Sequence, residues 1–224
     1  MKHSTLRISL VTLLLFAVSS LSWGQTDKDW AKFYRYQEAN TNVTKAPKAV
    51  FMGDSITDSW AKKDGEFFSA NNYAGRGISG QTTSHMLVRF RRDVIDLKPK
   101  YVVILAGTND IAKNNGVMTL ENILGNLISM CELARAHKIK PILCSVLPAA
   151  AYKWRPGMEP AEDIMKLNGM IWQYAKANRI PYVDYHSVLK DERNGLPVEL
   201  APDGVHPNIE CYKVMEEIVQ KYLR

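Results

Sequence analysis

The chain has 224 residues, which is enough for a short leader and one domain with a full hydrophobic core. Lys and Arg exceed Asp and Glu by six, but the basic residues are dispersed and no nucleic-acid-binding motif accompanies them, so no nucleic-acid partner is expected. The three cysteines, Cys131, Cys144 and Cys211, cannot all pair and lack metal-ligand spacing, which argues against a disulfide framework and a zinc site.

Residues 1–24 have the pattern of a secretory signal peptide. Lys2 and Arg7 flank the start of an apolar stretch at 8–18, and small residues then lead to Gly24, after which cleavage is expected. The apolar stretch is shorter than the ~20 residues of a transmembrane helix, and the alternative is an uncleaved amphipathic anchor. We therefore expect a signal peptide over 1–24, one domain over 25–224, a secreted or periplasmic protein, and no stable membrane insertion after cleavage.

Short apolar runs alternate with amphipathic segments along the rest of the chain. In order, the pattern predicts a helix from 27 to about 42, a strand at 49–52, a helix at 58–69, a strand at 71–74, a helix at 84–97, a strand at 101–106, a helix at 119–138, a strand at 141–147, an irregular loop at 148–160, a helix at 161–178, a strand at 180–184 and a helix from Pro207 onward. This alternation predicts an α/β fold, a three-layer α/β/α sandwich around a parallel, flavodoxin-like five-stranded sheet.

The densest basic group lies in the helix expected at 84–97. It consists of Arg89, Arg91 and Arg92, with Asp93 and Asp96 close by. A solvent-exposed helix face is the favoured interpretation of such a mixed group, and a nucleic-acid site is the alternative.

The stretch 50–57 contains the first candidate for chemistry. A strand ends at Gly53, and Ser55 follows at the turn into a helix, at the carboxyl edge where open α/β sheets place their ligands. A Ser hydroxyl is a weak nucleophile, so a catalytic role needs a base and an orienting carboxylate elsewhere. The alternative is that Ser55 only caps the helix. Asp54 is expected to tie down the turn.

The base should be a histidine, and His206 is the candidate among the five in the chain. It stands in a loop bounded by Pro and Gly just before the last helix, and Asp203 precedes it by three residues, so one tight turn can bring the carboxylate to the imidazole Nδ1. The other four lie in the leader, in helices or after the last strand, where surface or core roles are favoured.

Two further turns follow strands. The Gly-rich stretch 75–83 matches no phosphate-binding motif in its spacing, so nucleotide binding is not expected. Its glycines either let a backbone N–H approach a ligand or simply supply positive φ. The stretch 107–110 follows the most strand-like run of the chain, again at the carboxyl end of a strand.

Four short blocks resemble, in order, those of the SGNH hydrolases, also called the GDSL esterase/lipase family. They are Gly53-Asp54-Ser55-Ile56-Thr57, Gly77-Ile78-Ser79-Gly80-Gln81-Thr82-Thr83, Gly107-Thr108-Asn109-Asp110 and Asp203-Gly204-Val205-His206. Within the family the chain is similar to the catalytic subunits of intracellular platelet-activating factor acetylhydrolase and to bacterial acetylesterases that act on polysaccharides. It departs from the family pattern at Gln81, where many relatives have Asp, and at Ile56, where the older motif name has Leu.

The resemblance implies a role for each block. Ser55 would be the nucleophile, His206 the general base and then acid, and Asp203 its orienter. The oxyanion hole would combine the backbone N–H of Ser55, the backbone N–H of Gly80 and the side-chain amide of Asn109. No metal and no cofactor is implied.

The implied reaction is hydrolysis of a small-molecule or oligosaccharide ester through an acyl-enzyme. Because the leader favours an extracytoplasmic substrate, a short acyl group, acetyl above all, on a carbohydrate is the leading interpretation. The alternatives are a lysophospholipase or arylesterase and a non-catalytic carbohydrate-binding relative. Trp60, about one helical turn after the nucleophile, and Trp154, in the loop at 148–160, are candidates for stacking on sugar rings, unless both only pack the loop onto the domain. No oligomeric state is predicted.

Overall fold

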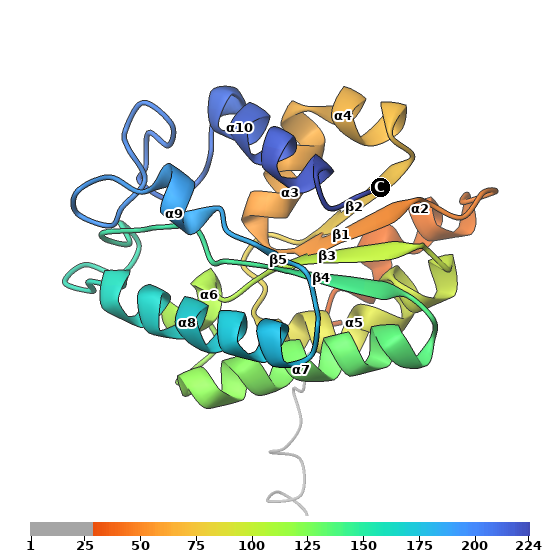
Figure 1. Ribbon diagram of the computed structural model, residues 1–224, viewed down its shortest axis with the longest axis horizontal. Coiled ribbons are helices and arrows are strands. Elements are labelled where there is room, and N and C mark those ends of the chain that lie inside the picture. Colours follow the sequence, from red (N-terminus) through yellow and green to blue (C-terminus); the bar gives the residue numbers. More distant parts are fainter. Residues whose placement is uncertain (1–28) are drawn as a thin grey trace, which may run out of the picture. The chain divides into compact units, whose positions relative to one another are not determined.

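Five parallel strands form one sheet in the order β2-β1-β3-β4-β5, which is the flavodoxin-like order (Figure 1). They are β1 (Ala49–Gly53), β2 (Tyr73–Gly77), β3 (Tyr101–Leu105), β4 (Lys140–Cys144) and β5 (Tyr182–Val183). The computed structural model describes residues 29–224, so the predicted signal peptide and the domain boundary at residue 25 lie outside the described residues. The predicted α/β/α fold is confirmed.

Helices cover both faces of the sheet. One face carries α5 (Thr83–Asp93), α7 (Leu120–Ala136) and α8 (Ala161–Ala177), and the other carries α3 (Ser55–Lys63), α4 (Gly65–Ala70) and α10 (Ile209–Gln220) (Figure 1). Shorter helical segments are η1 (Phe33–Tyr36), α2 (Gln37–Thr41), η2 (Ile95–Leu97), α6 (Thr108–Ile111) and α9 (His186–Leu189). Within residues 29–224, none of the helices combines the length and hydrophobicity that crossing a bilayer requires.

The sheet has a buried hydrophobic core on each face. Val50 and Met52 of β1 belong to the core that includes residues of α5, α7 and α8, whereas Ala49 and Phe51 belong to the core that includes residues of α3, α4 and α10. Successive side chains of a strand point to opposite faces, and here both faces are covered. This is why the strands are continuous apolar runs in the sequence rather than alternating ones.

The helix predicted at 58–69 is in fact two helices. The first, α3, already begins at Ser55 and ends at Lys63. Asp64 then leaves the helical conformation, with φ −133° and ψ 64°, and its side chain accepts a hydrogen bond from Phe67 N at 3.1 Å. Asp64 therefore ends one helix and caps the next, as short polar side chains at helix starts commonly do.

The second strand lies further along the chain than predicted. It spans 73–77 rather than 71–74, so it includes two glycines that the sequence placed in a turn. A Cβ on Gly77 would lie 2.2 Å from Asp58 N, and one on Gly75 would lie 2.6 Å from Ala61 Cβ. Both glycines therefore allow α3 to pack directly on the backbone of β2. Positive φ is needed only later in the stretch, at Gly80, where φ is 80°.

Three helix boundaries also differ from the prediction. The last helix begins at Ile209 rather than Pro207, because Asn208 is its N-cap and accepts a hydrogen bond from Cys211 N at 3.0 Å. The helix predicted at 84–97 ends as α5 at Asp93 and is followed by the short η2. In the described part of 27–42, helical structure covers only 33–41.

Candidate active site

Ser55 stands at the turn between β1 and α3. A Cβ on Gly53 would lie 2.1 Å from Thr57 Oγ1, so the sharp exit from the strand requires a glycine there. Asp54 is the N-cap of α3, and its Oδ1 accepts a hydrogen bond from Ile56 N at 2.9 Å. The capping role that the alternative interpretation gave to Ser55 thus belongs to Asp54. Ser55 is the first residue of the helix, where backbone N–H groups have no partner within the helix.

Two carboxyl groups near the carboxyl edge of the sheet are buried, those of Asp54 and Asp110. Burial raises the pKa of Asp54 to about 6 and that of Asp110, on α6, also to about 6. Asp110 accepts hydrogen bonds from Thr83, from Oγ1 at 2.6 Å and from the backbone N at 3.0 Å, which joins the start of α5 to α6. Both carboxyls therefore change charge near pH 6.

The candidate base and its orienting carboxylate form one tight turn. Asp203 Oδ1 accepts hydrogen bonds from Val205 N at 2.9 Å and His206 N at 2.7 Å. Gly204, the residue after Asp203, has a φ of 82°. Asp203 Oδ2 lies 2.6 Å from His206 Nδ1, and His206 Nε2 lies 2.9 Å from Ser55 Oγ. Burial would raise the pKa of Asp203, but the hydrogen bonds from His206 and Val205 outweigh it and lower this pKa.

An ionised Asp203 determines which ring nitrogen of His206 carries the proton. A carboxylate accepts only, so Nδ1–H donates to it, and Nε2 is left with a lone pair facing the Ser55 hydroxyl. This is the arrangement in which an imidazole can take a proton from a serine. The structure therefore brings together the three residues, 151 positions apart at their extremes, that the sequence proposed as a triad.

The loops after β2 and β3 meet beside the nucleophile turn. Ile78 N donates to Gly53 O at 3.1 Å, which attaches the first loop to the end of β1. Gly80 follows in the left-handed conformation that favours glycine, and the carbonyl of Gln81 accepts a hydrogen bond from Asn109 Nδ2 at 3.0 Å. Asn109, at the start of α6, is only 4% exposed. Gly80 and Asn109, which the resemblance places in the oxyanion hole, thus come from neighbouring segments, the loop after β2 and the start of α6.

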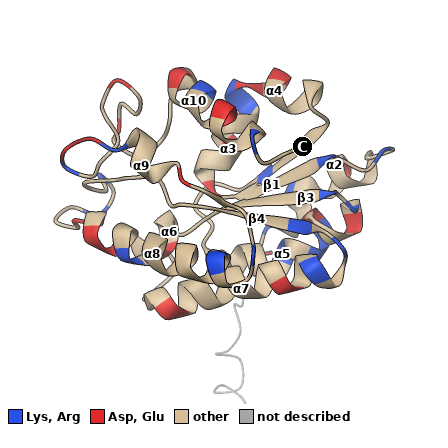
Figure 2. Cartoon of the chain, in the orientation of Figure 1, with Lys and Arg blue, Asp and Glu red and all other residues tan. Residues whose placement is uncertain are grey.

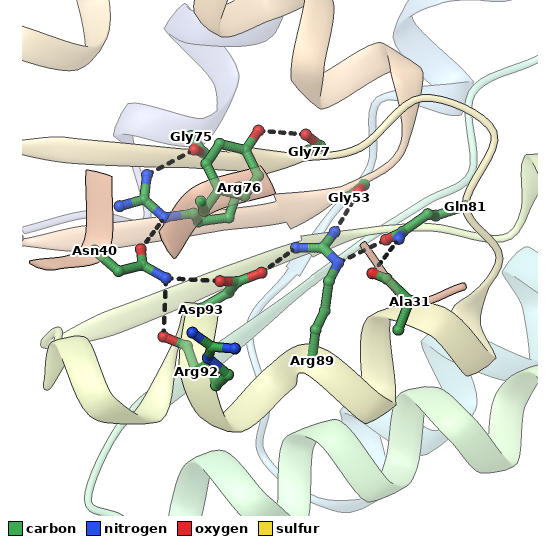
Figure 3. Close-up of polar contacts among 11 residues, drawn as sticks. Ala31, Asn40, Gly53, Gly75, Arg76, Gly77, Gln81, Arg89, Arg92 and Asp93 are labelled. Atoms are coloured by element: carbon green, nitrogen blue, oxygen red, sulfur yellow. Dashed lines mark hydrogen bonds and ion pairs between the residues drawn. The ribbon is translucent and has the colours of Figure 1, made fainter. Parts of the chain in front are cut away.

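A buried arginine, Arg89, connects the end of β1 to the loop after β2 (Figure 3). Arg89 Nη2 donates to Gly53 O at 3.1 Å, and Nε donates to Gln81 Oε1 at 2.6 Å. Its charge is balanced by Asp93, with Nη1 2.8 Å from Oδ2. Gln81 Nε2 in turn donates to Ala31 O at 2.8 Å. One guanidinium therefore holds the residue before the nucleophile turn and the residue after Gly80.

The prediction that Arg89, Arg91 and Arg92 lie on a solvent-exposed helix face is wrong for Arg89. Its exposed fraction is 0%, whereas Arg91 and Arg92 are exposed. Charged residues of both signs are distributed along the helices (Figure 2), but Arg89 lies on the buried side of α5 with Met86 and Phe90. The apolar spacing of those two neighbours was the available signal for burial.

Trp60 cannot contact a substrate, contrary to the prediction. It is 1% exposed and stacks between Phe67 and Tyr212, with ring centroids at 5.6 Å and 5.3 Å. Its Nε1 donates to Glu216 Oε1 at 3.0 Å. Ile56 is four residues earlier in the same helix and is also buried, so this position belongs to the core face of α3.

Trp154, by contrast, lies at the site. It is 39% exposed, its ring centroid is 6.2 Å from that of His206, and it stacks on Tyr152 at 4.8 Å. Its Nε1 donates to Asn114 Oδ1 at 3.1 Å, and Asn114 Nδ2 donates to Asn109 Oδ1 at 2.6 Å. Asn114 carried no sequence signal, because Asn is a common residue in loops.

The remaining reactive groups do not form a site of their own. All three cysteines are free and buried, and burial raises the thiol pKa in each case, to about 12 for Cys131 and about 11 for Cys211. In the part of the chain that the structure describes, no group of His, Cys, Asp and Glu side chains is arranged to hold a metal ion.

A parallel α/β/α sandwich with a Ser–His–Asp contact at the carboxyl edge of its sheet fits a hydrolase with a serine nucleophile. Residues 51–214 match the GDSL-like lipase/acylhydrolase family, and the chain belongs to this family. The structure is similar to the crystal structure of a GDSL-like lipase from Bacteroides thetaiotaomicron, with a TM-score of 0.83 and 46% sequence identity. The match covers 86% of this chain and 97% of the lipase.

Two curated relatives carry more specific names. The platelet-activating factor acetylhydrolase IB subunit alpha2 of Homo sapiens is 31% identical over 109 residues, which are 46% of this chain and 45% of that protein. An acetylxylan esterase of Geobacillus stearothermophilus is 25% identical over 201 residues, which are 77% of this chain and 92% of the esterase. The chain spans less than half of the length of the first curated relatives it matches, 31% of one and 45% of another.

Proposed function

We propose that the chain is a serine esterase that works through an acyl-enzyme. The observation that carries this proposal is the continuous contact from Ser55 Oγ to His206 Nε2 at 2.9 Å and from His206 Nδ1 to Asp203 Oδ2 at 2.6 Å. Ser55 Oγ attacks the ester carbonyl while His206 takes its proton, and the imidazolium then protonates the leaving alcohol. Water, deprotonated by His206, attacks the acyl-enzyme in the second half of the reaction and releases the acid.

The negative charge that develops on the carbonyl oxygen is stabilised by three N–H groups. These are the backbone N–H of Ser55 at the start of α3, the backbone N–H of Gly80, and Nδ2 of Asn109. The burial of Asn109 supports this assignment, because a hydrogen bond to an anion is stronger where water is excluded. Asp203, held by two backbone N–H groups, stabilises the imidazolium in both steps.

The proposed substrate is a short-acyl, above all acetyl, ester of a carbohydrate. Trp154 presents a partly exposed ring within 6.2 Å of the His206 ring, in a position to stack on a sugar next to the scissile ester. A cleft of about 590 Å³ begins at this side chain and is lined by Ile111, Lys113, Trp154, Arg155, Pro156, Gly157, Met158 and Asp163. Two relatives of the chain, an acetylhydrolase and an acetylxylan esterase, are named for acetyl esters.

We further propose that the protein is secreted or periplasmic, because the sequence of residues 1–24 has the signal-peptide pattern described above. This location suits an acetylated polysaccharide or its oligosaccharide fragments as the substrate. The competing substrate class is a lipid or aryl ester, which the name of the platelet-activating factor relative favours.

A series of p-nitrophenyl esters tests the reaction and the acyl group together. We expect hydrolysis that falls steeply beyond acetyl or propionyl, because an acyl pocket of the proposed size for acetyl cannot accept extra methylenes without overpacking. Ser55→Ala should remove nearly all activity, because the members of a triad act as a unit. Activity of Ser55→Ala within tenfold of the wild type would disprove the mechanism, and faster hydrolysis of octanoyl than acetyl esters would replace the carbohydrate substrate by a lipid.

The alcohol part is tested with Trp154→Ala. We expect KM for an acetylated xylo-oligosaccharide to rise about tenfold, the loss expected for one aromatic stacking contact of ~1.4 kcal/mol. KM for p-nitrophenyl acetate, which has no sugar, should stay the same. An equal change of KM for both substrates would assign Trp154 to the packing of its loop instead.

A further inference from the structure

Three side chains, those of Trp154, Asn114 and Asn109, form a relay of hydrogen bonds in which each side chain donates to the next, and the relay ends at the proposed oxyanion hole. Trp154 Nε1 donates to Asn114 Oδ1 at 3.1 Å, Asn114 Nδ2 donates to Asn109 Oδ1 at 2.6 Å, and Asn109 Nδ2 donates to Gln81 O at 3.0 Å. An indole N–H can only donate, and a backbone carbonyl can only accept. Each carboxamide between these two ends therefore has one orientation in which no two donors and no two acceptors face each other.

The relay is held in place by the backbone around it. Asn114 N donates to Asn109 O at 3.0 Å, so the backbone of one residue is fastened to that of the other. Arg155, next to Trp154, donates from Nε to Ala112 O and from Nη2 to Lys113 O, both at 3.0 Å. The loop that carries Trp154 is thus clamped onto the segment that carries Asn114.

The orientation of the Asn109 carboxamide matters because its two ends have opposite polarity. Nδ2 has two hydrogens, of which the Gln81 carbonyl accepts one, and the second is the one that the proposed function assigns to the oxyanion. A flipped carboxamide would present Oδ1 to the oxyanion and to the Gln81 carbonyl, and both contacts would become repulsive. Asn109 is buried, so little water is available to relieve them.

We propose that Asn114 is a positioning residue for this esterase, and that it fixes the Asn109 carboxamide with Nδ2 directed at the oxyanion. The donor-only indole of Trp154 fixes Asn114 in turn. The inference rests on the proposed function, since it concerns the oxyanion hole of the same reaction. It also gives Trp154 a second task, because the side chain proposed to bind the sugar sets the polarity of a group that stabilises the transition state.

Asn114→Asp is the sharpest test, because it changes polarity with almost no change of shape. One carboxylate oxygen can still accept from Trp154, but the other faces Asn109 Oδ1, and two acceptors at that distance repel each other. We expect the Asn109 carboxamide to turn over and kcat for p-nitrophenyl acetate to fall about 100-fold, with KM little changed. Asn114→Ala removes the donor to Asn109 and the acceptor for Trp154 but adds no repulsive acceptor, so it should cost about five- to tenfold, well below the 100-fold loss of a full donor.

The order of these two variants separates positioning from packing. If Asn114 only filled space, the isosteric Asp would be tolerated better than Ala, which is the opposite of the expected order. The pH dependence adds a second criterion, because the introduced carboxyl group, once protonated, could donate as the native carboxamide does. The kcat of Asn114→Asp relative to the wild type should therefore rise as the pH falls from about 8 to about 5, across the range of a carboxyl whose pKa is raised.

Asn115→Asp is the matched control. It introduces the same charge one residue away, on an exposed side chain that contacts His85 rather than Asn109, and kcat should remain within about twofold of wild type. Trp154→Phe keeps an aromatic platform but lacks the donor, so kcat should fall by a few fold while KM for the acetylated oligosaccharide is kept. The kcat values of all variants that keep Ser55 are normalised to active sites titrated with diethyl p-nitrophenyl phosphate, which separates a slower site from a smaller folded fraction.

The outcomes distinguish this inference from the proposed function. If the Ser55→Ala variant keeps the activity of the wild type, the proposed function is overturned, and this inference with it. If Ser55→Ala is inactive but the kcat of Asn114→Asp stays within threefold of wild type, this inference alone is overturned. An Ala variant that is slower than the Asp variant, or a loss in Asn115→Asp equal to that in Asn114→Asp, overturns it as well.

Discussion

Asp54→Asn should stabilise the folded chain above pH 6 and leave its stability nearly unchanged near pH 4. The Asp54 side chain is 2% exposed, and its burial raises the pKa from 3.8 to about 6. Asn has the same shape, can still accept the hydrogen bond from Ile56 N and is an equally good N-cap, but it never ionises. The variant therefore removes only the cost of a buried negative charge.

The size of the effect follows from the shift in pKa. Because the folded pKa is the higher one, the folded chain keeps a proton that the unfolded chain releases, so this contribution to stability is complete below pH 3.8 and is lost as the pH rises through about 6. A shift of about two units corresponds to about 3 kcal/mol. The shift already includes the hydrogen bond from Ile56 N at the start of α3, which favours the ionised form, so a gain of about 3 kcal/mol is expected for the variant at pH 8.

Urea unfolding of both proteins at pH 4 and pH 8 measures this gain. The free energy of unfolding of the variant minus that of the wild type is determined at each pH, and the value at pH 4 is subtracted from the value at pH 8. Asp110, whose pKa is also raised to about 6, titrates in both proteins, and most of its pH dependence is removed by the comparison. Because the charge of Asp110 also raises the pKa of Asp54, the difference between the two proteins includes the loss of this repulsion. A stability difference between the two proteins that does not change with pH would refute the reasoning. So would a variant that is less stable than wild type at pH 8.

Three further outcomes are expected. Asn109→Ala should lower kcat by about 10²–10³ with little change in KM, because its bond strengthens only as charge develops, and a pure KM effect would assign Asn109 to ground-state binding. Arg89→Met should lower the free energy of unfolding by about 3–5 kcal/mol in urea titrations, because Asp93 loses its buried partner, and a loss below about 1 kcal/mol would contradict the role of the ion pair. Gly77→Ala should lower Tm by at least several degrees, because its Cβ would lie 2.2 Å from Asp58 N, and an unchanged Tm would show that β2 and α3 can separate freely.

The parts of the site that could be predicted from sequence are those fixed by local geometry. Asp203 and His206 are three residues apart, so a single turn brings carboxylate and imidazole together whatever the rest of the fold does. Ser55 and Asn109 each follow a strand that could be recognised from its apolar residues, and parallel strands end at one edge of their sheet. Position along the chain was therefore enough to place these residues at a common edge.

What could not be predicted depends on which way side chains point and on partners far away in sequence. Closeness to Ser55 in the chain suggested that Trp60 could reach the substrate, but the helix turns this side chain into the core with Tyr212, which comes from the last helix of the chain. Arg89 was misread as a surface residue because its partners Gly53 and Gln81 belong to other elements, and only Asp93 is local. A charged residue in a helix is normally exposed, and burial is the exception that needs several partners at once.

The distance along the chain between the proposed nucleophile and its base has a consequence for biosynthesis. The two are 151 residues apart, and at a translation rate of about 5–20 residues per second the base leaves the ribosome roughly 8–30 s after the serine. The helix that follows His206 also has to dock, since Tyr212 in α10 donates to Ile56 O in α3 at 2.7 Å. A nascent chain therefore carries a serine with no base for most of its synthesis, and a prematurely terminated one never acquires it. Products that end before residue 206 lack the proposed base, and those that end before α10 also lack the contact between Tyr212 and Ile56.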